Sequence, residues 1–89
     1  MNPRVATVHP NPDYTITLTF ANGEVRRFDV KPYLNKGIFR ELRDIQVFNT
    51  VKPMLGSIQW RSGQDLCPDT LYMDSEPESE SELKAKSSR

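Results

Sequence analysis

The chain has 89 residues, of which 36% are hydrophobic, and its twelve acidic and twelve basic side chains give a formal net charge of zero. This length suits one small domain, and the balanced charge argues against a dedicated nucleic-acid-binding protein. The single cysteine, Cys67, excludes an internal disulfide and suits a reducing compartment. No apolar run approaches the length of a membrane span or a signal-peptide core, so we expect a cytoplasmic protein.

The first predicted elements are three strands. Alternating residues from Val5 to His9 predict a strand, which the prolines of the following Pro-Asn-Pro-Asp segment end. Threonines then alternate with large apolar residues up to Phe20, and an Asn-Gly pair follows. The chain continues as Glu-Val-Arg-Arg-Phe-Asp-Val, ending at Val30. This pattern predicts a half-buried β-hairpin.

The two faces of that hairpin decide its register. A two-residue Asn22-Gly23 loop would place Ile16 opposite Asp29, whereas a three-residue loop from Ala21 to Gly23 places Ile16 opposite Phe28. Because side chains alternate with period two, only the second register brings the large apolar residues together. It also suits a type I turn followed by glycine in the left-handed region. The alternate threonines then lie on the other face, which we expect to be solvated or lightly covered.

The second half of the chain predicts short helices and one further strand. Gly37 to Arg43 has the apolar spacing of a helix, and Asp44 is placed to cap a second helical turn. Met54 to Trp60 has strand character, and Pro68 suits the first turn of a last helix. The order β-β-β-α-α-β-α predicts an α+β domain with a small, mainly antiparallel sheet.

We predict a single α+β domain over residues 1–73 and a disordered polar, acidic tail over residues 74–89. Only Leu83 and Ala85 are apolar in the tail, so burial cannot offset the entropy of ordering it. The tail holds five acidic and three basic side chains, which leaves seven acidic and nine basic in the body. The body is therefore mildly basic.

Candidate catalytic and metal-binding residues are few. His9 is the only histidine and ends a strand, where a solvated histidine is ordinary. Cys67 lies in an apolar neighbourhood with no basic residue close in sequence, so we expect a buried structural thiol. Neither makes a zinc site with the scattered aspartates, since zinc usually takes three or four clustered ligands. We expect no enzymatic activity, no metal and no cofactor.

Asp29, Asp65 and Asp69 are the carboxylates with a conceivable chemical role. Paired carboxylates about 5–10 Å apart in a cleft perform acid–base catalysis in some enzymes. Turns and helix caps also explain these three positions, and we favour that structural interpretation. A weak carboxylate-based ligand-binding or hydrolase site is thus a second alternative, which an enclosed pocket joining the three side chains would support.

Candidate partner-binding residues are basic and aromatic. Positive charge concentrates in the middle of the chain, where Arg26, Arg27, Arg40 and Arg43 would share a surface if the helix packed against the hairpin. Such a surface would contact an acidic protein or phosphates, although a plain solvated face explains it as well. Trp60 fits either a core anchor, which we favour, or an interface hot spot.

Several short blocks, taken in order, resemble one protein family. They are Thr-Ile-Thr-Leu-Thr-Phe, Asn-Gly-Glu-Val-Arg-Arg-Phe-Asp-Val, Phe-Arg-Glu-Leu-Arg-Asp, Ile-Gln-Trp, Gly-Gln-Asp-Leu and Pro-Asp-Thr-Leu-Tyr. Over residues 3–73 the chain is similar to the small bacterial family called domain of unknown function 2442. The resemblance implies a compact α+β protein without an established activity. It also implies a gene often placed beside that of a second small protein, in a toxin–antitoxin-like pair.

Some relatives in that family carry an added helix-turn-helix domain, but the residues after Tyr72 lack helical periodicity. We therefore do not expect DNA reading through such a domain. The predicted function is a non-enzymatic protein-binding module, antitoxin-like or regulatory, whose toxin-like partner is encoded beside it. A homodimer is compatible with the small core. The first alternative is a nucleic-acid-associated accessory regulator that uses the basic residues, and we expect no membrane partner.

Overall fold

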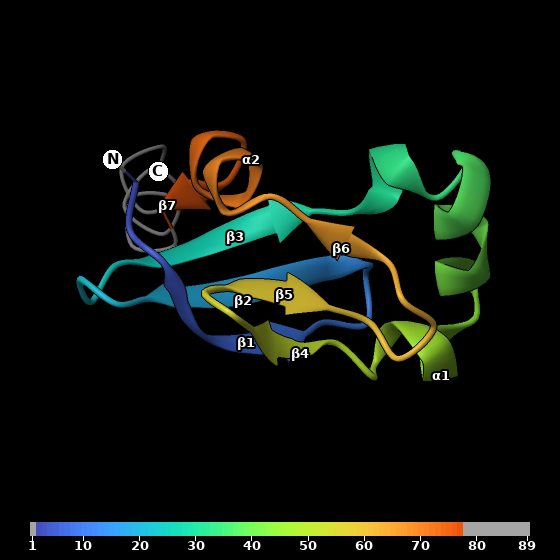
Figure 1. Cartoon of the computed structure of the whole chain (residues 1–89). Helices are drawn as coiled ribbons and strands as arrows, with labels where there is room; N and C mark the ends of the chain where they lie inside the picture. The colour runs from blue at the N-terminus through green and yellow to red at the C-terminus, as the bar shows by residue number, and fades with distance from the viewer. Residues whose placement is uncertain (1, 78–89) are drawn as a thin grey trace, which may run out of the picture.

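Two antiparallel sheets and several short helices form the fold, which confirms the α+β class (Figure 1). The computed structural model describes residues 2–77. The first sheet has the strand order β1-β2-β3-β7, with bounds Val5–Pro10, Thr15–Phe20, Val25–Asp29 and Glu76–Pro77. The second sheet has the order β4-β5-β6, with bounds Lys52–Met54, Ser57–Gln59 and Asp65–Leu66.

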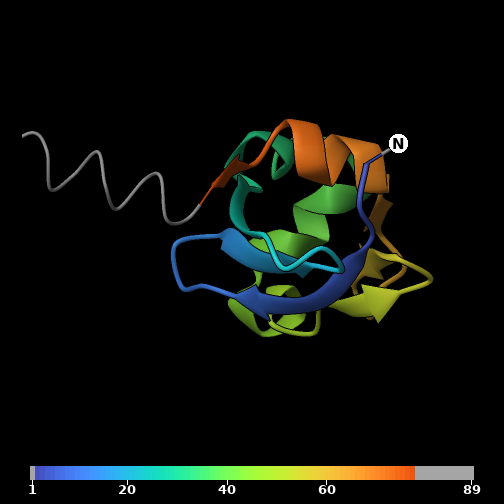
Figure 2. The same cartoon turned by 90° about the vertical axis from the view of Figure 1, so that its left-hand side faces the viewer.

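Helical segments connect and cover the two sheets. The 3₁₀ helices η1 (Lys31–Tyr33) and η2 (Gly37–Arg43) and the single-turn helix α1 (Ile45–Phe48) link β3 to β4. Helix α2 (Pro68–Met73) follows β6 and lies over the first sheet (Figure 2). The predicted cap of α1 is confirmed, because the Asp44 carboxylate accepts a hydrogen bond from the backbone N–H of Gln46 at 3.0 Å.

The β2–β3 hairpin has the register that its two faces predict. Ile16 lies opposite Phe28, and Thr17 lies opposite Arg27. Gly23 has a φ of +91°, and its N–H donates to the Phe20 carbonyl across the three-residue loop. A side chain would be strained at that φ, so glycine allows the loop that sets the register.

The threonine face of β2 is lightly covered, as expected. The side-chain amide of Asn11, in the β1–β2 turn, donates to the hydroxyls of Thr15 and Thr17, both at 3.0 Å. The Thr15 hydroxyl in turn donates to the Asp13 carboxylate at 2.6 Å. A polar turn therefore folds over one end of this face of the sheet.

The core fills the space enclosed by the two sheets and the helices. Trp60 is only 1% exposed, and its Nε1–H donates to the Phe48 carbonyl at 2.9 Å. Trp60 is therefore a core anchor, and its assignment as a partner-binding residue is wrong. The buried apolar residues come from both sheets, from η2, α1 and α2, and from the segments that join them; they are Val5, Ile16, Leu18, Phe20, Phe28, Val30, Leu42, Phe48, Val51, Ile58, Trp60 and Leu71.

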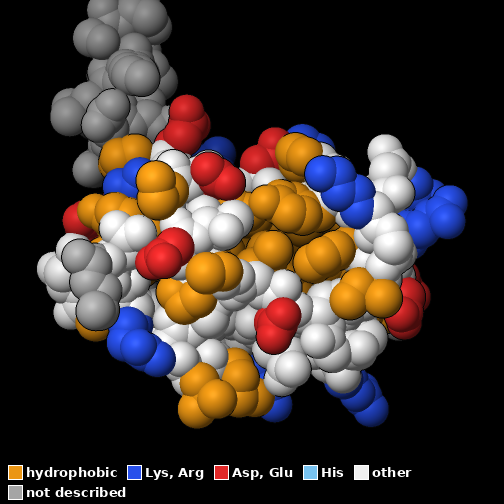
Figure 3. Space-filling model, turned by 45° about the horizontal axis from the view of Figure 1, so that its top comes forward, with side chains coloured by type: hydrophobic (Ala, Val, Ile, Leu, Met, Phe, Trp, Pro, Cys, Tyr) orange, Lys and Arg blue, Asp and Glu red, His pale blue; other side chains and the backbone are white. Residues whose placement is uncertain are grey.

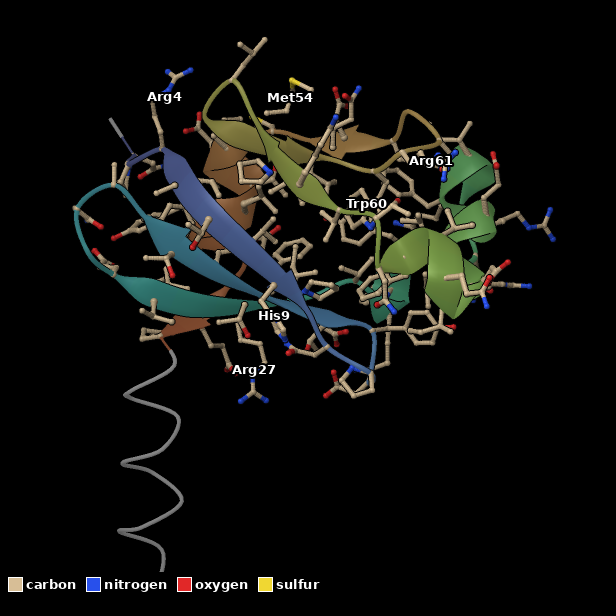
Figure 4. The ribbon with its side chains drawn as sticks, turned by 90° about the horizontal axis from the view of Figure 1, so that it is seen from below. Arg4, His9, Arg27, Met54, Trp60 and Arg61 are labelled. Carbon is tan, nitrogen blue, oxygen red and sulfur yellow. The ribbon has the colours of Figure 1, made fainter. Side chains whose placement is uncertain are left out.

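The two sheets meet beside β1. The Val5 N–H donates to the Gly56 carbonyl at 2.9 Å, so the start of β1 contacts the turn between β4 and β5. β1 and β4 lie side by side from there (Figure 4). This contact fixes the β4–β5 hairpin against the first sheet.

The apolar pattern from Met54 to Trp60 predicts one strand, but the segment contains the end of β4, a turn and β5. Leu55 and Gly56 both have positive φ angles, of +51° and +83°, and they reverse the chain between β4 and β5. The glycine was the available signal for this turn, since glycine inside a strand pattern often marks a break.

The segment Gly37 to Arg43 is helical as predicted but is a 3₁₀ helix. Its tighter turn of about three residues does not keep residues four apart on one face. Leu42 is therefore buried while Ile38 is 62% exposed. Cys67 is also exposed rather than buried, because it lies outside the sheet at the cap of α2.

The boundary predicted between Met73 and Asp74 is too early. Ser75 is buried, and β7 pairs with Arg26 and Arg27 of β3. Backbone pairing and hydrogen bonds to Arg26 order these residues, of which only Pro77 has an apolar side chain. The remainder of the predicted tail, residues 78–89, lies outside the described residues.

Replacing Trp60 by phenylalanine tests the core. The smaller ring leaves a cavity and removes the donor to the buried Phe48 carbonyl, so the free energy of unfolding should fall by about 2–4 kcal/mol. Urea unfolding followed by circular dichroism measures the change. Arg40→Gln, on the exposed side of η2, serves as the control and should change it by less than about 0.5 kcal/mol. Similar values for the two variants would contradict the anchoring role of Trp60.

Candidate functional site

The four candidate arginines do not share a surface. Arg26 and Arg27 are adjacent in β3, so their side chains point to opposite faces of the sheet. Arg40 and Arg43 lie on η2, at the other end of the molecule from the start of β3 (Figure 1). Nε of Arg43 donates to the Leu34 carbonyl at 3.0 Å, which holds that side chain against the loop before η2. The four arginines therefore do not form a single basic patch.

Arg26 has a structural role between the hairpin and the end of α2. Its Nε donates to the Ser75 hydroxyl at 2.8 Å, and Nη2 donates to the Ser75 carbonyl at 2.7 Å. The guanidinium also lies 4.5 Å from the centre of the Tyr72 ring and pairs with Glu24 at 3.2 Å. With only 14% of its side chain exposed, Arg26 is not available to a partner, contrary to the prediction.

Glu24 and Tyr72 complete this contact. The Tyr72 hydroxyl donates to Oε1 of Glu24 at 2.8 Å. This hydrogen bond, followed by one from the Asn22 amide, lowers the pKa of Glu24 below its ordinary value because both stabilise the carboxylate. The same hydrogen bond, with burial as a smaller cause, raises the pKa of the Tyr72 hydroxyl. The ionised carboxylate therefore helps to hold α2 on the hairpin.

Glu24→Gln tests that contribution through its pH dependence. A carboxyl group whose pKa is lower in the folded state stabilises the fold above its unfolded-state pKa, here near 4.5, and loses that effect as the pH falls through the lowered value. The wild type should therefore lose stability below pH 4.5 more steeply than the variant. Thermal unfolding at a series of pH values measures both slopes. Glu41→Gln, on exposed η2, should keep the wild-type slope; a wild-type slope in Glu24→Gln would contradict the contact.

Arg27 lies on the outer face of the first sheet. It is opposite Thr17 of β2 and Glu76 of β7, and His9 is opposite Thr17 on the other side, so the four side chains form one row across the face. Figure 4 labels both His9 and Arg27. This row is polar and carries both positive and negative charges, so it does not favour the binding of a polyanion such as a nucleic acid.

The three candidate carboxylates do not meet in one pocket. Asp29 accepts from the Lys31 N–H at 2.9 Å and pairs with its ammonium at 3.1 Å, and Asp69 accepts from the Asn2 amide at 3.2 Å. Asp65 and Asp29 line two different hollows. Within residues 2–77, no group of three histidine, cysteine, aspartate or glutamate side chains is placed to hold a metal ion. A carboxylate-based site therefore has no support from the geometry.

The β4–β5 turn, which we call the hairpin tip (Met54, Leu55 and Gly56), was not anticipated from the sequence. Two residues with positive φ make a type I′ turn, for which Asn-Gly is strongly preferred. Leucine in the left-handed region is unfavourable by about 1–2 kcal/mol. Its side chain is nevertheless 86% exposed, so the burial of this leucine does not offset the strain.

Arg4 and β1 hold the hairpin tip in place. Nη2 of Arg4 donates to the Leu55 carbonyl at 2.7 Å, and the Val5 N–H donates to the Gly56 carbonyl. A methyl group on Gly56 would lie 2.2 Å from Nε of Arg4, so the guanidinium packs directly on the glycine. The tip is thus a fixed turn that presents one apolar side chain to solvent. Figure 4 shows Arg4 beside the hairpin tip, of which Met54 is labelled.

The hairpin tip continues into the outer face of the second sheet. Lys52 lies opposite Gln59 and Met54 lies opposite Ser57, so these four side chains share the face turned away from buried Ile58. Near the tip is a mainly apolar hollow of about 370 Å³, which we call the tip hollow; its lining residues are Met54, Leu55, Ser57, Ile58, Asp65, Leu66, Cys67 and Pro68.

At the other end of this face is a second hollow of about 370 Å³, which we call the basic hollow; it is lined by Thr50, Lys52, Gln59, Trp60 and Arg61. Thr50 and Arg61 also line an adjoining hollow on α1. The outer face of the second sheet is therefore mainly apolar near the tip and carries Lys52 and Arg61 at its other end, with Asp65 opposite Gln59.

A further apolar hollow lies between the end of α2 and η1. It is lined in part by Phe28, Pro32 and Tyr33, and the Tyr33 ring packs on those of Phe28 and Phe39. Figure 3, which brings the α2 side forward, shows apolar side chains gathered in a hollowed area with single charges of both signs around it. Because these rings already pack on one another, this area extends the core.

A family model described as a protein of unknown function (DUF2442) matches residues 5–77, a range that includes both sheets. The chain belongs to the DUF2442 family. The match confirms the resemblance seen in the sequence blocks and extends it through β7. No curated protein and no solved structure was found to match this DUF2442 chain. In residues 2–77, no helix is long and apolar enough to span a membrane.

Leu55→Asn tests the strain at the hairpin tip. Asparagine tolerates a left-handed conformation, and almost no buried leucine surface is lost, so the free energy of unfolding should rise by about 0.5–1 kcal/mol. Chemical unfolding measures the change. Leu55→Val should lower it, because a β-branched side chain suits this conformation worst. A Leu55→Asn variant less stable than the wild type would show that Leu55 packs within the monomer.

Proposed function

We propose that this DUF2442 protein is a non-enzymatic protein-binding module whose partner docks on the hairpin tip and the outer face of the second sheet. The observation that carries the proposal is Leu55, an apolar side chain that is 86% exposed from a backbone conformation unfavourable to leucine. Strained residues persist where the surroundings hold them, and they cluster at functional sites. Burial of one leucine in an interface contributes about 1.5–3 kcal/mol, which is comparable to or larger than the strain of about 1–2 kcal/mol.

The partner that fits best is a protein encoded beside this chain, because the resemblance to this family implies a gene often placed beside that of a second small protein, in a toxin–antitoxin-like pair. The module would then act in the cytoplasm in an antitoxin-like or regulatory role. The role of an accessory nucleic-acid regulator has less support, since Arg26 is engaged in the fold and Arg27 lies far from Arg40 and Arg43 on η2. The hydrolase alternative has even less support, since Asp29 and Asp65 line two different hollows.

Affinity purification of three tagged chains tests the proposal. The wild type, Leu55→Asn and Ile38→Asn are purified from the native cells, with and without nuclease, and the bound proteins are quantified by mass spectrometry. Ile38 is a matched control, because it is an exposed apolar residue on a different element, η2. The wild type and Ile38→Asn should retain the same partner, and Leu55→Asn should lose about tenfold or more of it, independently of nuclease.

Retention of the same partner by Leu55→Asn would contradict docking at the hairpin tip. Loss of the partner on nuclease treatment would instead favour the nucleic-acid regulator. The chemical unfolding of Leu55→Asn is measured beside the purification, so that a loss of binding is distinguished from unfolding of the variant.

A further inference from the structure

We infer that the basic hollow receives a carboxylate of the docked protein, so that the partner segment is both acidic and apolar. This inference rests on the proposed function and adds the chemistry of the partner. It concerns Lys52, Gln59 and Arg61, which the strand pairing brings to one end of the outer face of the second sheet.

The two cations of the basic hollow have no counter-charge in it. Its lining contains no aspartate or glutamate. Across the described part of the chain, the side chains of Lys52 and Arg61 make no hydrogen bond and no ion pair. In contrast, the side chains of Arg4, Arg26 and Arg43 each donate to a backbone carbonyl. Two like charges facing one hollow repel each other, and a bound anion would relieve that repulsion.

The backbone that carries the donors of the hollow is held in place. The Arg61 N–H donates to the Thr50 hydroxyl at 3.0 Å, and that hydroxyl donates to the Val47 carbonyl at 2.6 Å, so the backbone beneath the guanidinium is anchored. Trp60, which is buried and held by its hydrogen bond to the Phe48 carbonyl, also lines the hollow. A guanidinium fork, an ammonium and the Gln59 amide match the two oxygens of a carboxylate.

A protein carboxylate fits better than a nucleic-acid phosphate. Asp65 lies opposite Gln59 on the same face and repels any anion, but this repulsion grows with the number of negative charges, so it opposes a run of phosphates more than it opposes one carboxylate. Lys52, which lines the hollow, is three residues before Leu55, which is a distance of about 10 Å at the usual rise per strand residue. A protein segment can place an acidic side chain that far from an apolar pocket for Leu55, and a phosphate backbone has no such pocket.

Nuclear magnetic resonance of the uniformly ¹⁵N-labelled full chain tests this inference with defined probes. The acidic probe is the peptide acetyl-Leu-Glu-Leu-Glu-Leu-amide, and its matched control has glutamine at both glutamate positions. The acidic peptide should shift the signals of Lys52, Gln59 and Arg61, and it should bind at least fivefold more tightly than the glutamine peptide. Lys52→Gln and Arg61→Gln should each remove that difference. Arg40→Gln, an exposed arginine on η2, should leave it unchanged.

Equal responses to the two peptides, or none, would overturn the inference. So would an equal response to inorganic phosphate, or tighter binding of a twelve-base-pair DNA duplex at the same signals with a steep salt dependence. These outcomes are separate from those of the purification. If capture of the partner depends on Leu55 but the acidic and glutamine peptides bind equally well, the proposed docking surface is supported and the inference of an acidic partner segment is wrong.

Discussion

The burial of one face of β2 is the constraint on which the rest of the fold depends. Ile16 and Leu18 are fully buried, and the threonines that alternate with them face the other way. Since the side-chain period is two, a shift of one residue would expose this apolar set. The register that avoids the shift also directs Arg26 towards α2 and Arg27 away from it. The docking of α2 and the polar outer face of the first sheet follow from the same alternation.

The second sheet depends on the first at β1. The Val5 N–H and the Arg4 guanidinium hold the two carbonyls of the Leu55-Gly56 turn, so the hairpin tip is part of the folded unit. That support explains how a leucine persists in a left-handed conformation. The fold holds an apolar side chain in solvent where asparagine would fit the turn better, and selection for stability alone does not account for that choice.

The distribution of charge shows why net charge says little about the function of this protein. Arg26 and Arg43 hold backbone carbonyls within the fold, and Lys31 pairs with Asp29. The cations of the basic hollow differ from these because no acid lines that hollow. A surface with few charges in defined positions is typical of recognition of a protein, whereas nucleic-acid binding relies on many phosphate contacts.

The sequence by itself determined the elements whose signals are local. The alternation in β2, the glycine at +91° in its loop, the cap at Asp44 and the proline that begins α2 each act within a few residues, and all are present as predicted. The family resemblance was also evident from the order of short blocks.

Only the tertiary structure decided the surface. Arg4 reaches the Leu55 carbonyl across 51 positions of sequence, and Arg26 reaches Ser75 across 49. No local pattern contains such contacts, so the sequence could not separate engaged arginines from available ones or show that Trp60 is buried. It also could not show that a leucine would occupy a turn that disfavours it. Local propensity reflects only the backbone conformation that neighbouring residues favour. Exposure and charge pairing instead depend on which distant segments the fold brings beside a residue.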